Sequence, residues 1–258
     1  MTMAEKGMIL RVEGMSRYFG GLKAVDDVSF HVSRGEILGL IGPNGAGKTT
    51  CFNVISGVYR PTAGKIFLEE ERIDGLPAHA IASRGVGRTF QIVRPFAGMT
   101  VLNNVMVGLG MQRYSSFLKS CPVFGDSQDR EEAMAFLREV GIEGLADGSS
   151  SVLSLGNLRR LEIARALALR PRLLLLDESF SGLSEEEIQQ MMELVRNIRE
   201  RGFSVLLIEH NMRVAMSLCH RLVVLDHGKK LAEGSPGEIR TDERVIEAYL
   251  GRGASAHA

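Results

Sequence analysis

The chain has 258 residues, of which 45% are hydrophobic and 24% are charged, and its formal net charge is +0. These values are typical of a globular protein with one large domain or two small ones. The balanced charge gives no reason to expect a nucleic-acid partner. No apolar run approaches the about 18 residues that a membrane-spanning helix needs. The first ten residues lack the basic and apolar regions of a signal peptide, so we expect a cytoplasmic protein.

The first part of the chain predicts short strands followed by helices. Runs of apolar and β-branched residues, separated by turns, predict strands at 8–12, 28–32, 36–41 and 65–68. Pro77 should open a short helix that ends at Gly85. From residue 100 to about 169 the pattern is mostly helical, with a helix at 131–140. A polar stretch at 114–128 interrupts this pattern and should form a loop.

The second part of the chain alternates strands with helices. Ser184 and Glu187 form a capping box, which predicts a helix that begins there and ends before Gly202. Around it the apolar runs predict further elements, with strands at 172–176, 203–208, 221–225 and 229–232 and a helix at 212–219. Such alternation is typical of an α/β fold with a parallel sheet covered by helices on both faces.

A glycine-rich motif links the strand at 36–41 to a predicted helix at 48–55. Residues 42–50 read GPNGAGKTT, and Gly42, Gly47, Lys48 and Thr49 fill the P-loop pattern. Backbone N–H groups and the positive end of the helix favour phosphate groups at such a turn. Lys48 would reach the β- and γ-phosphates of a nucleotide, and the Thr49 hydroxyl would bind Mg²⁺. The alternative is a glycine-rich turn with a chance lysine. We therefore expect a nucleotide site formed by Gly42, Pro43, Asn44, Gly45, Ala46, Gly47, Lys48, Thr49 and Thr50.

Two acidic residues follow the apolar run at 173–176. A strand buried on both faces would deliver Asp177 and Glu178 to its carboxyl end, where ligands of α/β sheets bind. Asp177 suits Mg²⁺, and Glu178 suits a general base that polarises the attacking water. The alternative is that both acids only solvate the end of a strand. The P-loop upstream favours the phosphoryl-transfer interpretation.

Gln91 and His210 are two further polar candidates. Gln91 lies where the chain leaves its β-rich part for the helical part, and His210 directly follows the run at 203–208. Such residues are more often ordinary surface groups. The sheet edge that His210 would share with Asp177 makes a role in the site more plausible.

Taken together and in this order, these motifs resemble the ATP-binding cassette (ABC) ATPases over residues 8–250. The resemblance implies a P-loop NTPase with a RecA-like parallel-sheet core, an N-terminal antiparallel β subdomain and an inserted helical subdomain. It implies one domain over 8–250, with the core and β subdomain at 1–99 and 170–250, the helical subdomain at 100–169 and a flexible tail at 251–258.

The resemblance also assigns roles to particular residues. Gln91 would be the Q-loop residue, counted with both the catalytic groups and the Mg²⁺ ligands, and His210 would contact the γ-phosphate. Phe19 matches the aromatic residue that stacks on adenine, with Tyr18 as the alternative. Ser154 and Gly156 match the signature motif, which in this family completes the ATP site of a partner cassette.

The signature departs from the usual LSGGQ of the family. Here it reads Leu153-Ser154-Leu155-Gly156-Asn157. Leu155 replaces a glycine and could restrict the backbone, and Asn157 carries a shorter amide than glutamine. This departure affects the ATP site of the partner rather than the P-loop of this chain.

Within the family, several stretches are similar to the ATPases of branched-chain amino acid importers, including 19–25, 88–91, 99–101, 161–165, 208–211 and 248–251. The ATPases of lipopolysaccharide export share the last of these and remain an alternative. A soluble cassette protein that acts on nucleic acid or the ribosome fits less well, because the chain has one cassette, no heptad run and no excess of basic residues.

The family further implies ATP and Mg²⁺ as ligands, and several protein partners. These would be transmembrane permease subunits, a second ABC ATPase in a heterodimer or homodimer and, indirectly, a periplasmic binding protein. The protein would then lie at the cytoplasmic face of the inner membrane as a peripheral subunit. The stretch 91–105 would adjoin the groove that receives a helix of the permease, with Arg94, Phe96 and Met99 as contacts or as ordinary packing residues.

Overall fold

The computed structural model describes residues 7–91, 94–113 and 127–250 of the chain. The predicted tail at 251–258 and most of the predicted loop at 114–128 lie outside these residues. The last two residues of that predicted loop were assigned wrongly, because helix α4 (Ser127–Glu139) already begins there. Asp129 lies buried in its first turn, where the helix dipole favours an acidic group.

The N-terminal part folds into an antiparallel sheet. Its order is β2-β1-β4-β5, formed by β1 (Met8–Phe19), β2 (Leu22–Ser33), β4 (Ala63–Leu68) and β5 (Glu71–Arg72). Strands β1 and β2 are longer than the predicted runs, because register shifts let them stay paired from Met8–Ser33 to Phe19–Leu22. The expected antiparallel subdomain is therefore confirmed.

A second sheet forms the core, in the order β10-β9-β3-β8-β7-β6. Its strands are β3 (Ile37–Ile41), β6 (Val86–Arg88), β7 (Leu173–Asp177), β8 (Ser204–Ile208), β9 (Arg221–Asp226) and β10 (Lys229–Gly234). The strands from β9 to β6 are parallel and β10 is antiparallel. Every residue of β3, β7 and β8 is buried, as their continuous apolar runs predict. Strands β5 and β6 were not predicted, because two or three residues are too few to show an alternating pattern.

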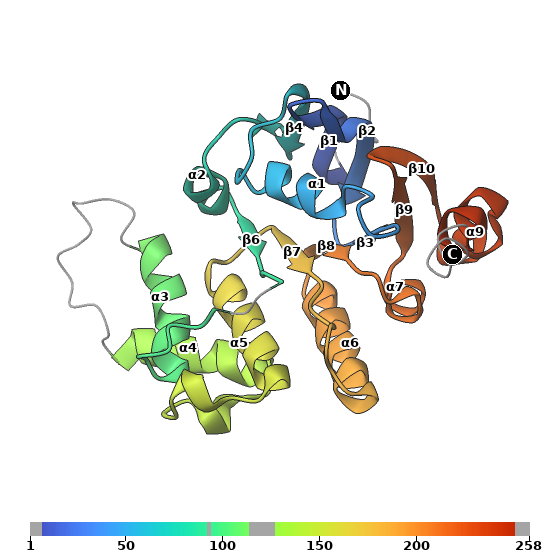
Figure 1. Ribbon diagram of the computed structural model, residues 1–258. Helices are drawn as coiled ribbons and strands as arrows, with labels where there is room; N and C mark the ends of the chain where they lie inside the picture. The colour runs from blue at the N-terminus through green and yellow to red at the C-terminus, as the bar shows by residue number, and fades with distance from the viewer. Residues whose placement is uncertain (1–6, 92–93, 114–126, 251–258) are drawn as a thin grey trace.

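Helices surround the core sheet (Figure 1). They are α1 (Lys48–Ile55), α2 (Ala78–Ser83), α3 (Val101–Arg113), α4, α5 (Leu155–Ala168), α6 (Glu185–Glu200), α7 (Met212–Leu218), α8 (Pro236–Thr241) and α9 (Glu243–Leu250), with short 3₁₀ turns at Glu143–Leu145 and Ser150–Val152. Helix α1 packs between the two sheets, where Phe52 and Ile55 join the apolar cluster of both. Helices α3, α4 and α5 gather into a lobe at the lower left of Figure 1.

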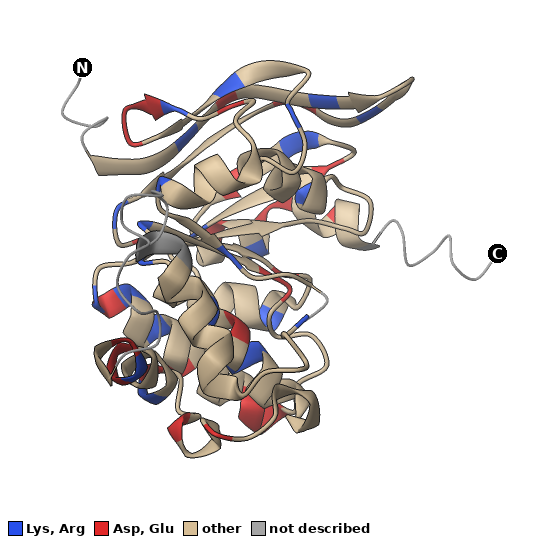
Figure 2. Cartoon of the chain, turned by 90° about the vertical axis from the view of Figure 1, so that its left-hand side faces the viewer, with Lys and Arg blue, Asp and Glu red and all other residues tan. Residues whose placement is uncertain are grey.

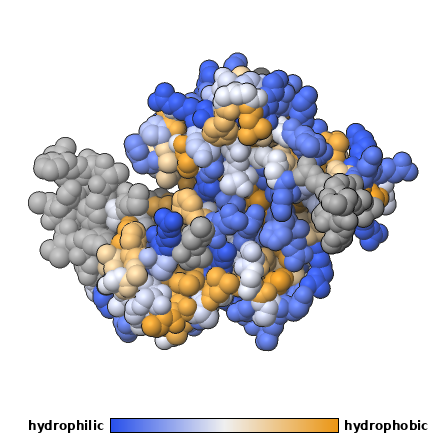
Figure 3. All heavy atoms as spheres, viewed as in Figure 1, coloured by the Kyte–Doolittle hydropathy of each residue, from blue (hydrophilic) through white to orange (hydrophobic). Residues whose placement is uncertain are grey.

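The lengths of the helices and the character of the surface bear on function. None of the helices in the described part of the chain is long and apolar enough to cross a membrane. Basic and acidic residues are interspersed on the face drawn in Figure 2 rather than separated by sign. Apolar residues reach the surface of the helical lobe in Figure 3.

Candidate nucleotide site and docking groove

The loop between β3 and α1 has a backbone that only glycine can form. Gly42 has a φ of 146° and Gly47 a φ of 102°. A Cβ on Gly42 would lie 2.1 Å from the carbonyl oxygen of Leu225, and one on Gly47 would lie 2.4 Å from that of Ala24. Both positions therefore exclude a side chain, which lets the loop lie tightly against β9 and β2.

Lys48 begins helix α1 and lies inside this loop. Its side chain is buried, and Nζ donates hydrogen bonds to the carbonyl oxygens of Gly42 at 2.7 Å and Pro43 at 3.0 Å. No side chain caps the amino end of α1, so its first N–H groups and its positive dipole end face the loop. The N–H of Gly228, in the turn between β9 and β10, donates to the carbonyl oxygen of Ala46 at 3.1 Å. This hydrogen bond ties the glycine-rich loop to that turn.

A cavity of about 500 Å³ opens over this loop. Seven consecutive residues, 44–50, contribute to its wall, together with Glu178. The remaining lining residues come from two neighbouring β-turn regions and are Leu22, Lys23, Ala24, His227 and Gly228. A cavity with backbone donors and a lysine on one side and a carboxylate on the other suits a phosphate chain.

Three of the predicted polar residues meet at the carboxyl ends of β6, β7 and β8. The Nε2 atom of Gln91 donates to Oε2 of Glu178 at 2.8 Å, and Nδ1 of His210 lies 3.8 Å from the same oxygen. The backbone N–H of Glu178 donates to the carbonyl oxygen of Ile208 at 3.1 Å. Glu178 has a φ of 48°, a conformation that side chains rarely adopt and that is often found at functional sites.

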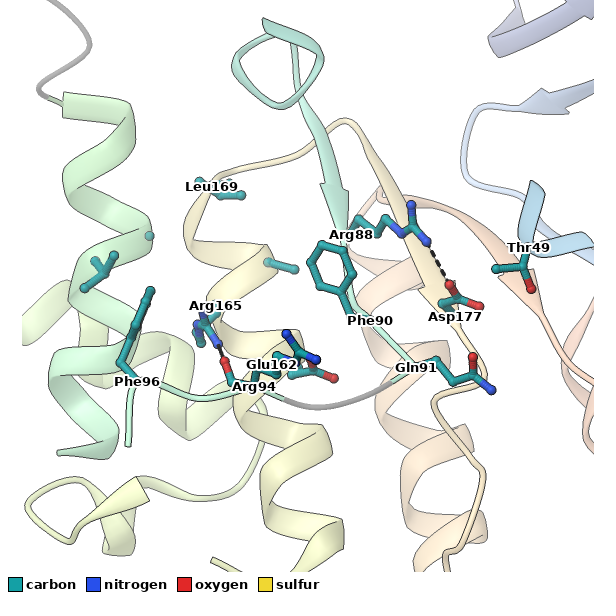
Figure 4. Close-up of a pocket in the computed structure, with 13 residues that line it drawn as sticks. Thr49, Arg88, Phe90, Gln91, Arg94, Phe96, Glu162, Arg165, Leu169 and Asp177 are labelled. Carbon is teal, nitrogen blue, oxygen red and sulfur yellow. Dashed lines mark hydrogen bonds and ion pairs between the residues drawn. The ribbon is translucent and has the colours of Figure 1, made fainter. Parts of the chain in front are cut away.

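Asp177 lies beside this group and is almost fully buried. Its Oδ2 accepts a hydrogen bond from Nη2 of Arg88 at 2.9 Å, whereas Oδ1 has no hydrogen-bond partner among the described residues. Burial raises the pKa of Asp177, and the guanidinium of Arg88 lowers it in part. In Figure 4 the second oxygen lies on the side of Asp177 that faces Thr49, and both residues line a second cavity between the core sheet and the helical lobe. A buried carboxylate oxygen that lacks a partner, opposite a hydroxyl, is what a hydrated Mg²⁺ would need.

A second cavity, of about 580 Å³, lies between the core sheet and the helical lobe, and we call it the groove (Figure 4). Its walls contain Thr49, Arg88, Phe90, Gln91, Arg94, Phe96, Val107, Gly108, Glu162, Arg165, Ala166, Leu169 and Asp177. Arg94 and Phe96 line this cavity and Met99 does not; the expectation that they contact a permease helix stays a prediction. Phe96 is 42% exposed, and its ring lies 4.6 Å below the guanidinium of Arg165.

Glu162 of the groove wall forms a buried ion pair within helix α5. Nη1 of Arg159 lies 3.7 Å from Oε2 of Glu162 and donates to the carbonyl oxygen of Phe90 at 3.1 Å. The carboxylate of Glu162 accepts a hydrogen bond from the backbone of the same Phe90. Burial raises the pKa of Glu162 to about 7, because Arg159 only partly compensates for the lost hydration. Helix α5 thus contacts both the carbonyl oxygen and the backbone donor of Phe90, the residue directly before Gln91.

Other predicted residues lie away from these two cavities. Phe19 pairs with Leu22 at the end of the β1–β2 hairpin, next to the P-loop cavity but not in its wall. It is 39% exposed, whereas the hydroxyl of Tyr18 donates to Asp26 at 2.6 Å. Ser154 caps helix α5 by accepting from the N–H of Asn157.

The signature residues line neither cavity of the described chain. Gly156 packs against α6, where a Cβ would lie 2.5 Å from Oε1 of Glu187. Leu155 begins helix α5 and is not among the residues with a positive φ, so the leucine causes no backbone strain in this structure.

Arg88 is the main residue of the site that sequence reasoning missed. It belongs to the quoted stretch 88–91, but an isolated arginine in a short edge strand gives no sign that it pairs with Asp177, 89 positions later. The residues at the start of β2 (22–24) and in the turn after β9 (227–228) were missed for the same reason, since only the fold brings them to the P-loop.

Comparison with known proteins agrees with this geometry. Residues 25–181 match the sequence model of the family described as ABC transporter, and residues 229–255 match that described as branched-chain amino acid ATP-binding cassette transporter. The chain is 44% identical to the high-affinity branched-chain amino acid transport ATP-binding protein BraF of Pseudomonas aeruginosa, over 94% of this chain and 98% of that protein.

Two further similarities bear on the function. The lipopolysaccharide export system ATP-binding protein LptB of Acidithiobacillus ferridurans is 40% identical, over 94% of this chain and 97% of that protein. The crystal structure of a nucleotide-free ATP-binding cassette from an ABC transporter superposes with a TM-score of 0.84 at 30% identity, over 94% of this chain and 98% of that one.

Proposed function

The chain belongs to the ABC transporter family, as an ATPase subunit of the branched-chain amino acid type, and we propose on this basis that it powers the uptake of branched-chain or similar amino acids. Like other ATPases of this family it works with membrane permease subunits, which carry the cargo. The similarity of the segment 229–255 to the branched-chain transporters is the observation that carries the proposed cargo.

The P-loop cavity supports a specific mode of ATP binding. The backbone donors of residues 44–49 and the amino end of α1 would hold the β-phosphate. Lys48 would exchange its contacts with the carbonyl oxygens of Gly42 and Pro43 for phosphate oxygens. The exposed ring of Phe19, at the adjoining hairpin end, would stack on adenine.

Glu178 is positioned to act as the general base for hydrolysis. It lies in the wall of the P-loop cavity, where its carboxylate would accept a proton from the attacking water. Gln91 and His210 both lie at its Oε2 atom and would orient it, and His210 would also reach the γ-phosphate. These contacts support the proposed roles, because a base works only when it is held at the proton it removes.

The metal ligands would be Thr49, Asp177 and Gln91. The orphaned Oδ1 of Asp177 would accept a hydrogen bond from metal-bound water, and the Thr49 side chain lies opposite Asp177 in Figure 4. The amide nitrogen of Gln91 contacts Glu178, which leaves the amide oxygen for the metal. When Mg²⁺ is bound with ATP, it neutralises charge on the phosphates.

A second cassette would complete each ATP site. Ser154 and Gly156 lie at the amino end of α5 and line neither cavity of this chain, which supports a role in the site of a partner. We propose a heterodimer with a homologous cassette at the cytoplasmic face of the inner membrane. The groove, with Phe96 and Arg94 in its wall, would receive a helix of the permease. Cargo would reach that permease from a periplasmic binding protein.

Export of lipopolysaccharide is the second candidate, favoured by the similarity to LptB over nearly the whole chain. The two functions differ in their membrane subunits and cargo. Purification of the chain with the permeases encoded beside its gene, followed by uptake of labelled leucine into proteoliposomes, separates them. Export of lipid-linked sugar without leucine uptake would overturn the importer proposal.

The role of Glu178 is tested by the variant Glu178→Gln. We expect ATP binding to persist and hydrolysis in the assembled transporter to slow by at least about 100-fold, the scale of losing a positioned base. Glu186→Gln, at an exposed acid of helix α6, is the matched control and should hydrolyse ATP normally. Turnover of Glu178→Gln near that of the wild type would remove Glu178 from the chemistry.

A further inference from the structure

Arg88 connects three elements around the proposed metal site. It ends the edge strand β6, and only 9% of its side chain is exposed. Nη1 donates to Oδ1 of Asn53 at 2.9 Å and to Oγ of Ser56 at 2.6 Å, both on the helix that follows the P-loop. Nη2 donates to Oδ2 of Asp177 at 2.9 Å, at the end of β7.

The guanidinium is also held by its surroundings. The ring of Phe52 lies 5.8 Å from it and that of Phe90 lies 5.1 Å from it. Hydrogen bonds to Asn53 and Ser56 fix the plane of the guanidinium relative to α1, so Asp177 meets a donor whose place is set by the P-loop helix. An arginine can serve several acceptors in one plane, which a lysine cannot do.

The position of Asp177 depends on this contact. Arg88 occupies Oδ2, and the backbone N–H of Asp177 donates to Oγ1 of Thr89 at 3.2 Å. The remaining oxygen, Oδ1, is buried without a partner in the described part of the chain and points toward Thr49 (Figure 4). The rotation of the Asp177 carboxylate therefore decides which of its oxygens faces Thr49.

We propose that Arg88 is a positioning residue that orients Asp177 for Mg²⁺ and ties it to the P-loop helix. The inference rests on the proposed function, because it concerns the same nucleotide site. Simple charge repulsion leads to the opposite expectation, since a cation beside a metal site weakens metal binding and its removal would strengthen it. The two effects can be separated by a variant that keeps the positive charge at Arg88 but lacks the planar set of donors.

The test compares Arg88→Met, which removes the charge, with Arg88→Lys, which keeps the charge but not the planar donors. Binding of a fluorescent, non-hydrolysable ATP analogue is measured with Mg²⁺ and with a chelator. Loss of an outer-shell partner reduces metal affinity by about tenfold or more, so we expect both variants to lose about that much of the preference for Mg²⁺–nucleotide. Affinity in chelator should stay close to that of the wild type.

Two further variants keep the test decisive. Arg84→Met, at a partly exposed residue paired with Glu71 outside the site, should retain the preference of the wild type. Asn53→Ala with Ser56→Ala removes the anchors of Arg88 but leaves its charge, and should reproduce the loss even where Arg88→Met does not fold. A preference that rises in Arg88→Met and is unchanged in Arg88→Lys would overturn the inference. Wild-type protein that binds no nucleotide would instead overturn the proposed function.

Discussion

The P-loop cavity and the groove share Thr49 but are built in different ways. The wall of the first comes mainly from the consecutive residues 44–50 and is largely backbone. The wall of the second comes mainly from side chains of β6, α3, α5 and the segment that joins β6 to α3. In this wall Arg165 and Phe96 stack on each other. The first can be recognised from a short stretch of sequence, whereas the second exists only when the lobe packs on the core.

The two cavities also differ in how charge is arranged. In the P-loop cavity, Lys48 and the amino end of α1 supply positive charge for a polyphosphate. In the groove, Glu162 is buried and its charge is paired with Arg159 behind the wall, so the wall offers mainly apolar side chains and the guanidinium groups of Arg94 and Arg165 to the proposed partner. The segment 88–91 lies between the cavities and contacts both Asp177 and Glu178. The groove wall also contains Thr49, Gln91 and Asp177, so docking should be separable from nucleotide chemistry at Phe96, which lies at the opposite end of the groove from Thr49 (Figure 4).

The sharpest test of this separation is Phe96→Asp, which replaces an apolar ring in the groove wall with a charged carboxylate. The backbone there is held by Asn104 and Ser150, so the fold should tolerate the change. Truncating or charging a central contact typically costs 2 kcal/mol or more, so binding to the permease should weaken by about 30-fold or more while ATP binding is kept. Co-purification with the membrane subunits and nucleotide titration measure the two effects.

Leu145→Asp is the matched control for Phe96→Asp. Leu145 is similarly exposed on the helical lobe but lies outside the groove. It should leave complex formation unchanged. Equal loss of the complex in both variants would show that the groove is not the docking site.

A smaller effect is expected for Phe19→Ala, next to the P-loop cavity. Stacking of a base on an aromatic ring contributes about 1–3 kcal/mol, so ATP affinity should fall by about tenfold. The dependence on Mg²⁺ should change less, because Thr49 lies in the wall of the P-loop cavity and Phe19 does not. Equilibrium binding with and without Mg²⁺ measures this. An unchanged affinity would point to Tyr18 instead.

A further effect, on folding stability rather than on binding or docking, concerns the pH dependence at Glu162 in the groove. Its pKa of about 7 in the folded chain lies above the ordinary value of 4.5. Between these two pH values the folded chain binds more protons than the unfolded chain, so this residue makes stability fall as pH rises. Glu162→Gln should remove a difference on the order of 2 kcal/mol in unfolding free energy between pH 5 and pH 8.

Urea unfolding at both pH values measures that difference. Glu209 and Asp177 also have a raised pKa, but they are present in both proteins and cancel in the comparison. Glu193→Gln, at an exposed position of α6, serves as the control and should leave the pH slope as it is in the wild type. A Glu162→Gln variant with the slope of the wild type would contradict the assignment.

Much of this fold could be predicted from local patterns. Helix α1 was predicted at its observed bounds, and the capping box of Ser184 and Glu187 starts α6 as expected. Strands β3, β7 and β8 were recognised because each is a continuous apolar run. The edge strand β6 was missed, since three residues carry no pattern and are held in place by pairing with β7.

The candidate site likewise contains parts that local sequence predicts and parts that only the fold creates. Sequence alone determined the nucleotide loop, because the P-loop pattern lies within nine consecutive residues and its glycines at Gly42 and Gly47 take a positive φ. It also placed Asp177, Glu178 and His210 at one sheet edge, since parallel strands end together. Only the tertiary structure decided that Arg88 holds Asp177 and that α5 holds Phe90. Those contacts join residues about 70 to 90 positions apart, and long-range packing leaves no periodic trace in a sequence.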